Sequence, residues 1–597
     1  MSRRLWFALA AVAVAFAPTA GRAEVAGFPA SAEVRGQIVD EAGGPVFGAD
    51  VIVARPDGSA RRAAISDAQG RFTVSGGEAG RVVVTVIAGR GARVATETLD
   101  LAPGATALLR VRDDAGKGTL AVTSAETELP GQVLAADCIQ QTGAKTPALS
   151  RQGDVAGALA ALPEAGPATA PAGAPVLAGL PLSEVAVSFE GFSLSDPIDG
   201  DVPAELPLSV LGAVAVEAGP VPSVALRAPT IERKQTALSG GLALARGARG
   251  ADDLARPRGV TGGWDFALRR DSTGRWGRGT VAFSPRHQIW EADPTSVRAA
   301  RGRKQRTIPL LLWGESELAG WHVRGGLLGL LTTRHYGRGG HVLASGDPID
   351  GVAHQRNWGL VGVNAGRDIG RGDHVGLSLG VLRTTREESL AALPAHESTG
   401  TTVSGATNVT VSGSLAGEHR LNGGLGFTLS TGERTGLSAS RQPGLLLTDA
   451  TARVFRPYLA LSERYAPSLH LEVEAGFGLA LASFSGSSKV EGGATLERSF
   501  RGRLWFAPHG RLSVRPLVGP SVLGIHVMAA RTPGKLPLLA LMDATSGPRV
   551  ELPLPAQDAL ALAADLSTRR LHLRLMAQTR RDATVLEDRF AAATGQP

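Results

Sequence analysis

Alternation of apolar and polar residues recurs throughout the C-terminal part of the chain. The clearest run extends from Leu469 to Leu481, where every second residue is apolar and the residues between are polar or glycine. This period of two places the two sets on opposite faces of a β-strand. Shorter runs of the same kind are Val375–Val381, Val409–Val411, Leu425–Leu429 and Leu571–Leu575. The pattern predicts a long series of strands over residues 236–597.

An apolar face of roughly ten residues is the length that a tilted strand needs to cross a bilayer. After residue 23, no apolar run reaches the roughly 18 residues that a membrane-spanning helix needs. We therefore expect residues 236–597 to form a transmembrane antiparallel β-barrel, with about 14 to 18 strands at roughly 22 to 25 residues per strand and loop. A soluble β-sandwich would also alternate, and aromatic residues are few at 5%.

Short alternating strands also mark residues 31–112. Val34–Val39 and Ala49–Val53 flank a turn at Glu41–Pro45, and Asp67–Gly70 provides the turn before Phe72 and Val74. The sequence here resembles the carboxypeptidase regulatory-like domain, which implies a β-sandwich. No zinc-site spacing accompanies it. The sequence of this domain fits two functions, a docking domain and a rigid spacer.

The first 23 residues match a secretory signal peptide. Arg3 and Arg4 precede an apolar run from Leu5 to Phe16, and small residues lie before Glu24. Removal of this segment takes away three arginines and lowers the formal charge from +7 to +4. So small a charge on so long a chain indicates no nucleic-acid partner. The single cysteine, Cys138, excludes an intramolecular disulfide.

Residues 131–230 read as a small α/β unit. Val185–Phe189 predicts a strand, Glu190-Gly191 and Ser195–Pro197 predict turns, and Val214–Val216 predicts a second strand. Upstream, Asp154 is placed to cap a short helix that Pro163 ends.

This order resembles the plug of a TonB-dependent outer-membrane receptor, on the sequence from Pro175 to Pro220. The resemblance implies a domain that lies inside the barrel and closes it, with Val187 and Val216 in neighbouring strands. Two features depart from the family: Ala178-Gly179 stands where an Arg-Gly pair is usual, and the motif after Pro220 is blurred over Ser223–Gly241.

Residues 113–130 are expected to be a linker. The segment Thr119, Leu120, Ala121, Val122 and Thr123 resembles the family's TonB box, which pairs by its main chain with the sheet edge of the energising protein. A disordered link without a partner is the alternative.

Catalytic motifs are absent from the sequence, which contains no G-x-S-x-G, H-E-x-x-H or phosphate-binding loop. We therefore expect no enzyme activity, no cofactor and no metal site. Four arginines, Arg269, Arg270, Arg275 and Arg278, would favour anionic solutes if they line a lumen, and would otherwise belong to a solvated strand face.

Together these features predict an all-β-dominated chain with a sandwich, a plug and a barrel of fewer than 22 strands. The first functional hypothesis is a TonB-dependent receptor-like transporter for an unidentified solute. It would lie in the cell outer membrane among its lipids, with the N-terminal domain in the periplasm beside a TonB-type energising protein. The second is a structural or adhesive outer-membrane protein with a degenerate plug.

Overall fold

The computed structural model describes residues 32–584 with gaps. Apart from residues 1–31 and 585–597, the main stretches outside the description are 136–152, 167–175, 245–259, 291–302 and 543–555. The predicted signal peptide, residues 1–23, thus lies outside the described residues. The described chain is dominated by strands, with the short helix α3 (Val155–Ala160) and the 3₁₀ helix η1 (Leu208–Val210) between them. This confirms the expected all-β class.

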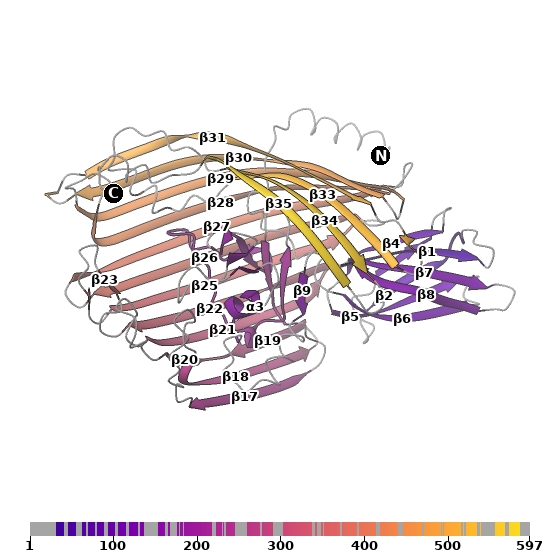
Figure 1. Ribbon diagram of the computed structural model, residues 1–597, viewed down its shortest axis with the longest axis horizontal. Coiled ribbons are helices and arrows are strands. Elements are labelled where there is room, and N and C mark those ends of the chain that lie inside the picture. The colour runs from indigo at the N-terminus through magenta and orange to yellow at the C-terminus, as the bar shows by residue number, and fades with distance from the viewer. Residues whose placement is uncertain are drawn as a thin grey trace.

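Two four-stranded sheets form the N-terminal sandwich, with strand orders β4-β1-β7-β8 and β3-β2-β5-β6 (Figure 1). The strands are β1 (Ala32–Asp40), β2 (Asp50–Ala54), β3 (Arg62–Ile65), β4 (Arg71–Gly77), β5 (Gly80–Ala88), β6 (Arg93–Leu101), β7 (Thr106–Asp114) and β8 (Thr119–Glu128). Val34, Ile38, Val84 and Val111 from both sheets share one buried core. Alternate apolar residues therefore fill the space between the sheets, and the predicted sandwich is confirmed.

The stretch 113–130 differs from the expected linker. β8 pairs antiparallel with β7, from Thr119 opposite Asp114 to Glu128 opposite Thr106. The residues between these strands include Gly116 and Gly118. Glycine suits a hairpin turn as well as a linker, so only the pairing with β7 decides between the two structures.

The plug contains a five-stranded sheet of order β14-β13-β16-β15-β9. Its strands are β9 (Gln132–Ala135), β13 (Ala186–Phe189), β14 (Phe192–Ser193), β15 (Ala213–Glu217) and β16 (Ser223–Arg227), and a smaller sheet contains β10 (Ala165–Gly166), β11 (Val176–Leu177) and β12 (Leu180–Pro181). Val224 pairs with both Val187 and Val216. Those two valines are thus in one sheet but not in neighbouring strands, as had been expected, because β16 lies between them.

A 17-stranded antiparallel sheet, here called the barrel sheet, forms the rest of the described chain. Its strands are β17 (Gln235–Leu244), β18 (Val260–Gly274), β19 (Gly277–Phe283), β20 (Arg286–Trp290), β21 (Arg303–Leu318), β22 (Trp321–Tyr336), β25 (Val352–Asp368), β26 (His374–Leu390), β27 (Leu393–Gly413), β28 (Glu418–Ala439), β29 (Leu446–Ser468), β30 (Leu471–Val490), β31 (Thr495–Val514), β32 (Leu517–Val518), β33 (Ser521–Pro533), β34 (Ala556–Ser567) and β35 (His572–Thr584). Within the described residues this sheet has fewer than 22 strands, as expected. A separate hairpin contains β23 (His341–Val342) and β24 (Pro348–Ile349).

The strand order of the barrel sheet begins with β17 and ends with β35, and among the described residues no pairing joins these two strands. β19 and β20 both pair with β18 and with β21, so they form one span interrupted at Ser284-Pro285. The interruption follows from Pro285, which has no backbone N–H to donate.

The two faces of the barrel sheet differ as the alternation predicted. On β26, Leu377, Leu379 and Val381 are 43%, 58% and 40% exposed, whereas Ser378 and Leu382, on the other face, are 8% and 3% exposed. The outer face therefore presents apolar side chains, as a lipid-facing surface requires. Separately, no helix among the described residues is long and apolar enough to cross a membrane.

Connections at the two ends of the barrel sheet differ in length. At one end, Ala319-Gly320 joins β21 to β22, and residues 469–470 join β29 to β30. The long connections, 245–259, 337–351 and 534–555, all lie at the other end, which also has short ones such as residues 391–392 between β26 and β27. The sandwich lies at the end with short turns (Figure 1), where the Arg71 guanidinium donates to the Pro467 carbonyl at 3.2 Å.

Candidate functional site

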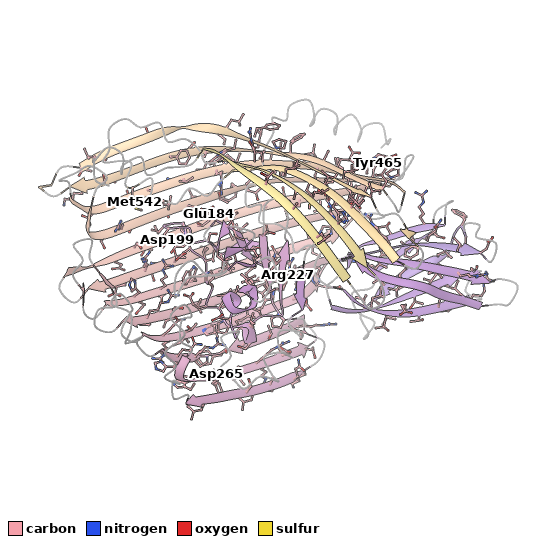
Figure 2. The ribbon with its side chains drawn as sticks, viewed as in Figure 1. Glu184, Asp199, Arg227, Asp265, Tyr465 and Met542 are labelled. Carbon is pink, nitrogen blue, oxygen red and sulfur yellow. The ribbon has the colours of Figure 1, made fainter. Side chains whose placement is uncertain are left out.

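In the described chain, ion pairs and polar hydrogen bonds are most concentrated at the interface between the plug and the inner wall of the barrel sheet. Figure 2 shows Asp199 and Arg227 of the plug in front of the strands that form this wall.

The hairpin that joins β13 to β14 places a carboxylate in the interface. Glu190 and Gly191 have φ angles of 49° and 88°, and Phe189 pairs with Phe192 across them. Two central residues with positive φ define the tight turn that matches the twist of a two-stranded hairpin. The sequence predicted this turn from Glu190-Gly191, but not that Glu190 would be fully buried.

Buried Glu190 is held by groups from both domains. One carboxylate oxygen accepts a hydrogen bond from the Ala228 backbone N–H at 2.7 Å. The other lies 3.8 Å from Arg227 of the plug and 3.6 Å from Arg324 of β22. Burial lowers the pKa of Arg227 to about 10, although Glu190 opposes the shift, so Arg227 stays charged at neutral pH.

Aromatic side chains of the same hairpin fit against the wall. Gly362 and Gly380 face each other across β25 and β26, and a Cβ atom on either glycine would overlap the Phe192 ring. The Phe189 ring packs edge to face against the Trp313 ring, with the two ring centroids 5.2 Å apart. The glycine pair thus forms the space that Phe192 occupies.

An acidic plug loop, residues 196–201, lies against two arginines of the wall. Asp199 Oδ2 accepts hydrogen bonds from Arg356 at 2.5 Å and from Arg386 at 2.8 Å. Arg356 also pairs with Asp201, and the Thr384 hydroxyl donates to Asp196 at 2.9 Å. In the arginine–aspartate pairs both the donor and the acceptor are ionised, so these hydrogen bonds are stronger than hydrogen bonds between neutral groups.

Further contacts tie the plug to the wall along its length. Arg286 of β20 donates to the Gly153 carbonyl at 2.7 Å, and the hydroxyls of Ser209 and Ser284 are 2.6 Å apart. Arg334 of β22 pairs with Glu205. The wall therefore holds the plug at many points rather than through a single latch.

Two apolar side chains from the 534–555 connection enter the interface from the end with long connections. The Leu538 backbone N–H donates to the Pro197 carbonyl at 2.8 Å. Leu538 and Met542 share a buried cluster with Ile198 of the plug and with wall alanines such as Ala452. This part of the connection packs on the acidic plug loop.

The sandwich makes its own buried ion pairs with the barrel sheet. Glu472 of β30 is 2% exposed, and its Oε2 lies 3.2 Å from Arg35 of β1 and 2.7 Å from Arg464 of β29. In the sequence, Glu472 belonged to the polar face of the Leu469–Leu481 run. The sequence did not indicate that Arg35 of the sandwich would be its partner.

The TonB-box-like segment Thr119–Thr123 lies in β8, at the edge of its sheet. Val122 pairs with Val111 and Ser124 with Arg110, so Thr123 is a bulged residue without a register partner. Bulges are common on edge strands. The structure does not bring this segment to the plug interface.

The four arginines named from the sequence have different surroundings. Arg269 pairs with Asp271 at 2.8 Å, and Arg278 donates to the Ile231 carbonyl at 3.1 Å. Arg270 is exposed, and Arg275 lies outside the described residues. The wall arginines that contact the plug, Arg324, Arg356 and Arg386 among them, were missed, although their place on polar strand faces was a usable signal.

Among the residues that the structure describes, no group of three or more His, Cys, Asp or Glu side chains could hold a metal ion. The site thus consists of ion pairs and apolar packing between two parts of one chain.

Comparisons with known proteins agree with this architecture. The carboxypeptidase regulatory-like domain family matches residues 33–112, so the sandwich is a domain of that kind. No curated protein matches the sequence.

Solved structures of TonB-dependent receptors share the fold. The ferric-catecholate import receptor Fiu from E. coli K12 superposes with a TM-score of 0.53 at 11% identity, over 76% of this chain and 73% of that one. The siderophore receptor PiuA from Acinetobacter baumannii gives 0.53 at 10% identity, over 76% and 72%. The ferric citrate transporter FecA gives 0.57 at 11% identity, over 76% and 70%. The chain therefore has the plug-and-barrel fold of these receptors.

Proposed function

We propose that this protein is an outer-membrane, receptor-like transporter that takes up a solute through the barrel when its plug is rearranged. The observation that carries the proposal is the plug itself, which is folded and bonded to the inner wall by residues such as Glu190, Phe192 and Asp199. A degenerate plug would not be expected to keep so many matched contacts. This observation favours transport over the structural or adhesive alternative.

The lengths of the connections support an orientation. Outer-membrane barrels have short turns on the periplasmic side and longer loops outside the cell. The sandwich contacts the end with short turns through Arg71 and Pro467. We therefore place the N-terminal domain in the periplasm, where an energising protein of the TonB type is available as partner.

Edge strand β8 is our candidate contact for that partner. β8 is the last strand in the order β4-β1-β7-β8, and β4, at the opposite edge, carries the Arg71 that contacts the barrel. An edge strand can accept another strand by main-chain hydrogen bonds. Thr119–Thr123 would then act as part of a sheet edge on the side away from the barrel.

Fractionation with a protease-accessibility assay tests the proposal. The protein should be recovered with the outer membrane, and its gel mobility should change on boiling, because intact barrels resist detergent unfolding. An epitope at Phe47, which is 75% exposed in the sandwich, should be cleaved only after the outer membrane is permeabilised. Recovery in the soluble periplasm would refute the barrel, and cleavage in intact cells would refute the orientation.

A further inference from the structure

The ion pairs between plug and wall have a consistent polarity. Each of five wall arginines faces a carboxylate of the plug. The pairs are Arg286 with Asp154, Arg324 with Glu190, Arg334 with Glu205, Arg356 with Asp199 and Asp201, and Arg386 with Asp199. The wall of β20 to β26 is therefore positive where the plug surface is negative.

Within this wall, Arg356 and Arg386 form a distinct pair. They are directly opposite each other in the β25–β26 register. Like charges in opposed positions of neighbouring strands repel each other, so an anion is needed between them. Asp199 supplies it, since one of its oxygens accepts hydrogen bonds from both guanidinium groups.

The pair lies towards the end of the barrel sheet with long connections. Arg356 is four residues from the start of β25 at Val352, and Arg386 is four from the end of β26 at Leu390. The Asp201 side chain, which also pairs with Arg356, is 48% exposed. The two carboxylates are thus held at a partly open edge of the interface.

We infer that Arg356 and Arg386 form a binding site for an anionic solute with two carboxylate groups, and that Asp199 and Asp201 occupy this site as a tethered competitor. The inference rests on the proposed transport function, because it names the class of solute that the same interface recognises. A dicarboxylate reproduces the two acids that Arg356 engages here. When it displaces them, residues 196–201 lose their hold on the wall, which links arrival of the solute to release of this part of the plug.

Succinate binding to the full-length protein in detergent micelles, measured by calorimetry at constant ionic strength, tests this inference. Arg356→Gln and Arg386→Gln should each weaken binding about 10-fold or more, because each removes charge-assisted hydrogen bonds. Asp199→Asn should strengthen binding by about 10-fold, because a tethered acid competes at an effective concentration in the millimolar range.

The opposite signs of these changes separate a ligand site from a structural ion pair. If the ion pairs were purely structural, a change of the arginine and a change of the aspartate would have effects of the same sign. Arg383→Gln is the matched control, since Arg383 is exposed on the outer face of β26, and it should bind succinate as the wild type does. Asp201→Asn is a second variant that should tighten binding if Asp199→Asn disturbs folding.

Acetate and inorganic phosphate complete the test. Binding of either as tight as that of succinate would overturn the dicarboxylate assignment, and unchanged or weaker binding by both aspartate variants would overturn the tethered-competitor model. These outcomes are independent of cellular location. The variants could change succinate affinity in the expected directions while the protein is recovered from the soluble periplasm. That result would reject the proposed transport function and leave this inference standing.

Discussion

At the scale of single residues, the plug interface depends on side chains that would be unfavourable elsewhere. Glu190 is fully buried in a left-handed conformation, which costs free energy unless its surroundings compensate. The Ala228 N–H, Arg227 and Arg324 provide that compensation. Since Arg324 belongs to β22, docking of the plug on this strand adds to the stability of both the turn and its buried charge.

Asp196 makes this docking sensitive to pH. Its carboxylate is 3% exposed and accepts hydrogen bonds from the Ile198 N–H and the Thr384 hydroxyl. Burial, and next the charge of nearby Asp199, raise the pKa of Asp196 from 3.8 to about 6, while Arg356 opposes the shift. The docked plug thus favours the neutral carboxyl, so its stabilisation is complete below about pH 4 and is lost as the pH rises through 6.

The expected effect of Asp196 is about 3 kcal/mol across this range, at about 1.4 kcal/mol per pKa unit. Amide protection of residues 196–201, measured by hydrogen exchange and corrected for intrinsic rates, should fall between about pH 4 and pH 6.5 and change little above that range. Asp196→Asn should remove most of this dependence, because the amide does not titrate. An equal fall in the variant would show that Asp196 is not the cause.

At the scale of elements, β8 determines whether the TonB-box-like segment can act as a sheet edge. Its pairing with β7 fixes Leu120 and Val122 opposite Asp113 and Val111, and Thr123 bulges from the ladder. An edge strand with a single neighbour can still accept a strand on its other side. If Thr119–Thr123 is the proposed contact, it would bind as an edge strand without unfolding.

A photo-crosslinking amino acid at Thr123 tests this role of β8. In cells that contain a TonB-type protein, an adduct with that protein should form at Thr123. Ala63, exposed in β3 on the opposite side of the sandwich, is the control position and should give none. Equal adducts at both positions, or none at Thr123, would argue against β8 as the contact.

At the scale of the whole molecule, Glu472 links the sandwich to the barrel. Its carboxylate is shared between Arg35 and Arg464, and all three side chains are largely buried. Removing the acid from such a group leaves buried positive charge without compensation, which costs about 3–5 kcal/mol. The position of the sandwich over the short-turn end should therefore depend on this residue more than on the single hydrogen bond from Arg71 to Pro467.

Glu472→Gln should loosen the sandwich. With spin labels at Thr96 of β6 and at Leu318, the last residue of β21, in a background without Cys138, the distance distribution should broaden relative to the wild type. Glu474→Gln is the control, since Glu474 is nearby on β30 but lies 3.9 Å from His509 of the same sheet. Equal distributions in wild type and Glu472→Gln would show that other contacts fix the sandwich.

Sequence alone determined the elements whose signals are local. Period-two alternation predicted strands such as β26 and β30 and their apolar outer face, because a strand places successive side chains on opposite faces whatever lies beside it. Asp154 was predicted to cap a helix, and its carboxylate accepts the Gly157 N–H at 2.8 Å. The Glu190-Gly191 turn was predicted for the same reason.

Tertiary structure decided everything that depends on which strands meet. Gly116 and Gly118 fit a linker or a hairpin, and pairing with β7 selected the hairpin. The family's motif after Pro220 is blurred, yet Ser223–Arg227 forms β16 at the centre of the plug sheet, where Val224 pairs on both sides. Arg356 and Asp199 are more than 150 residues apart, and no local pattern joins two charges that meet only when the plug enters the barrel.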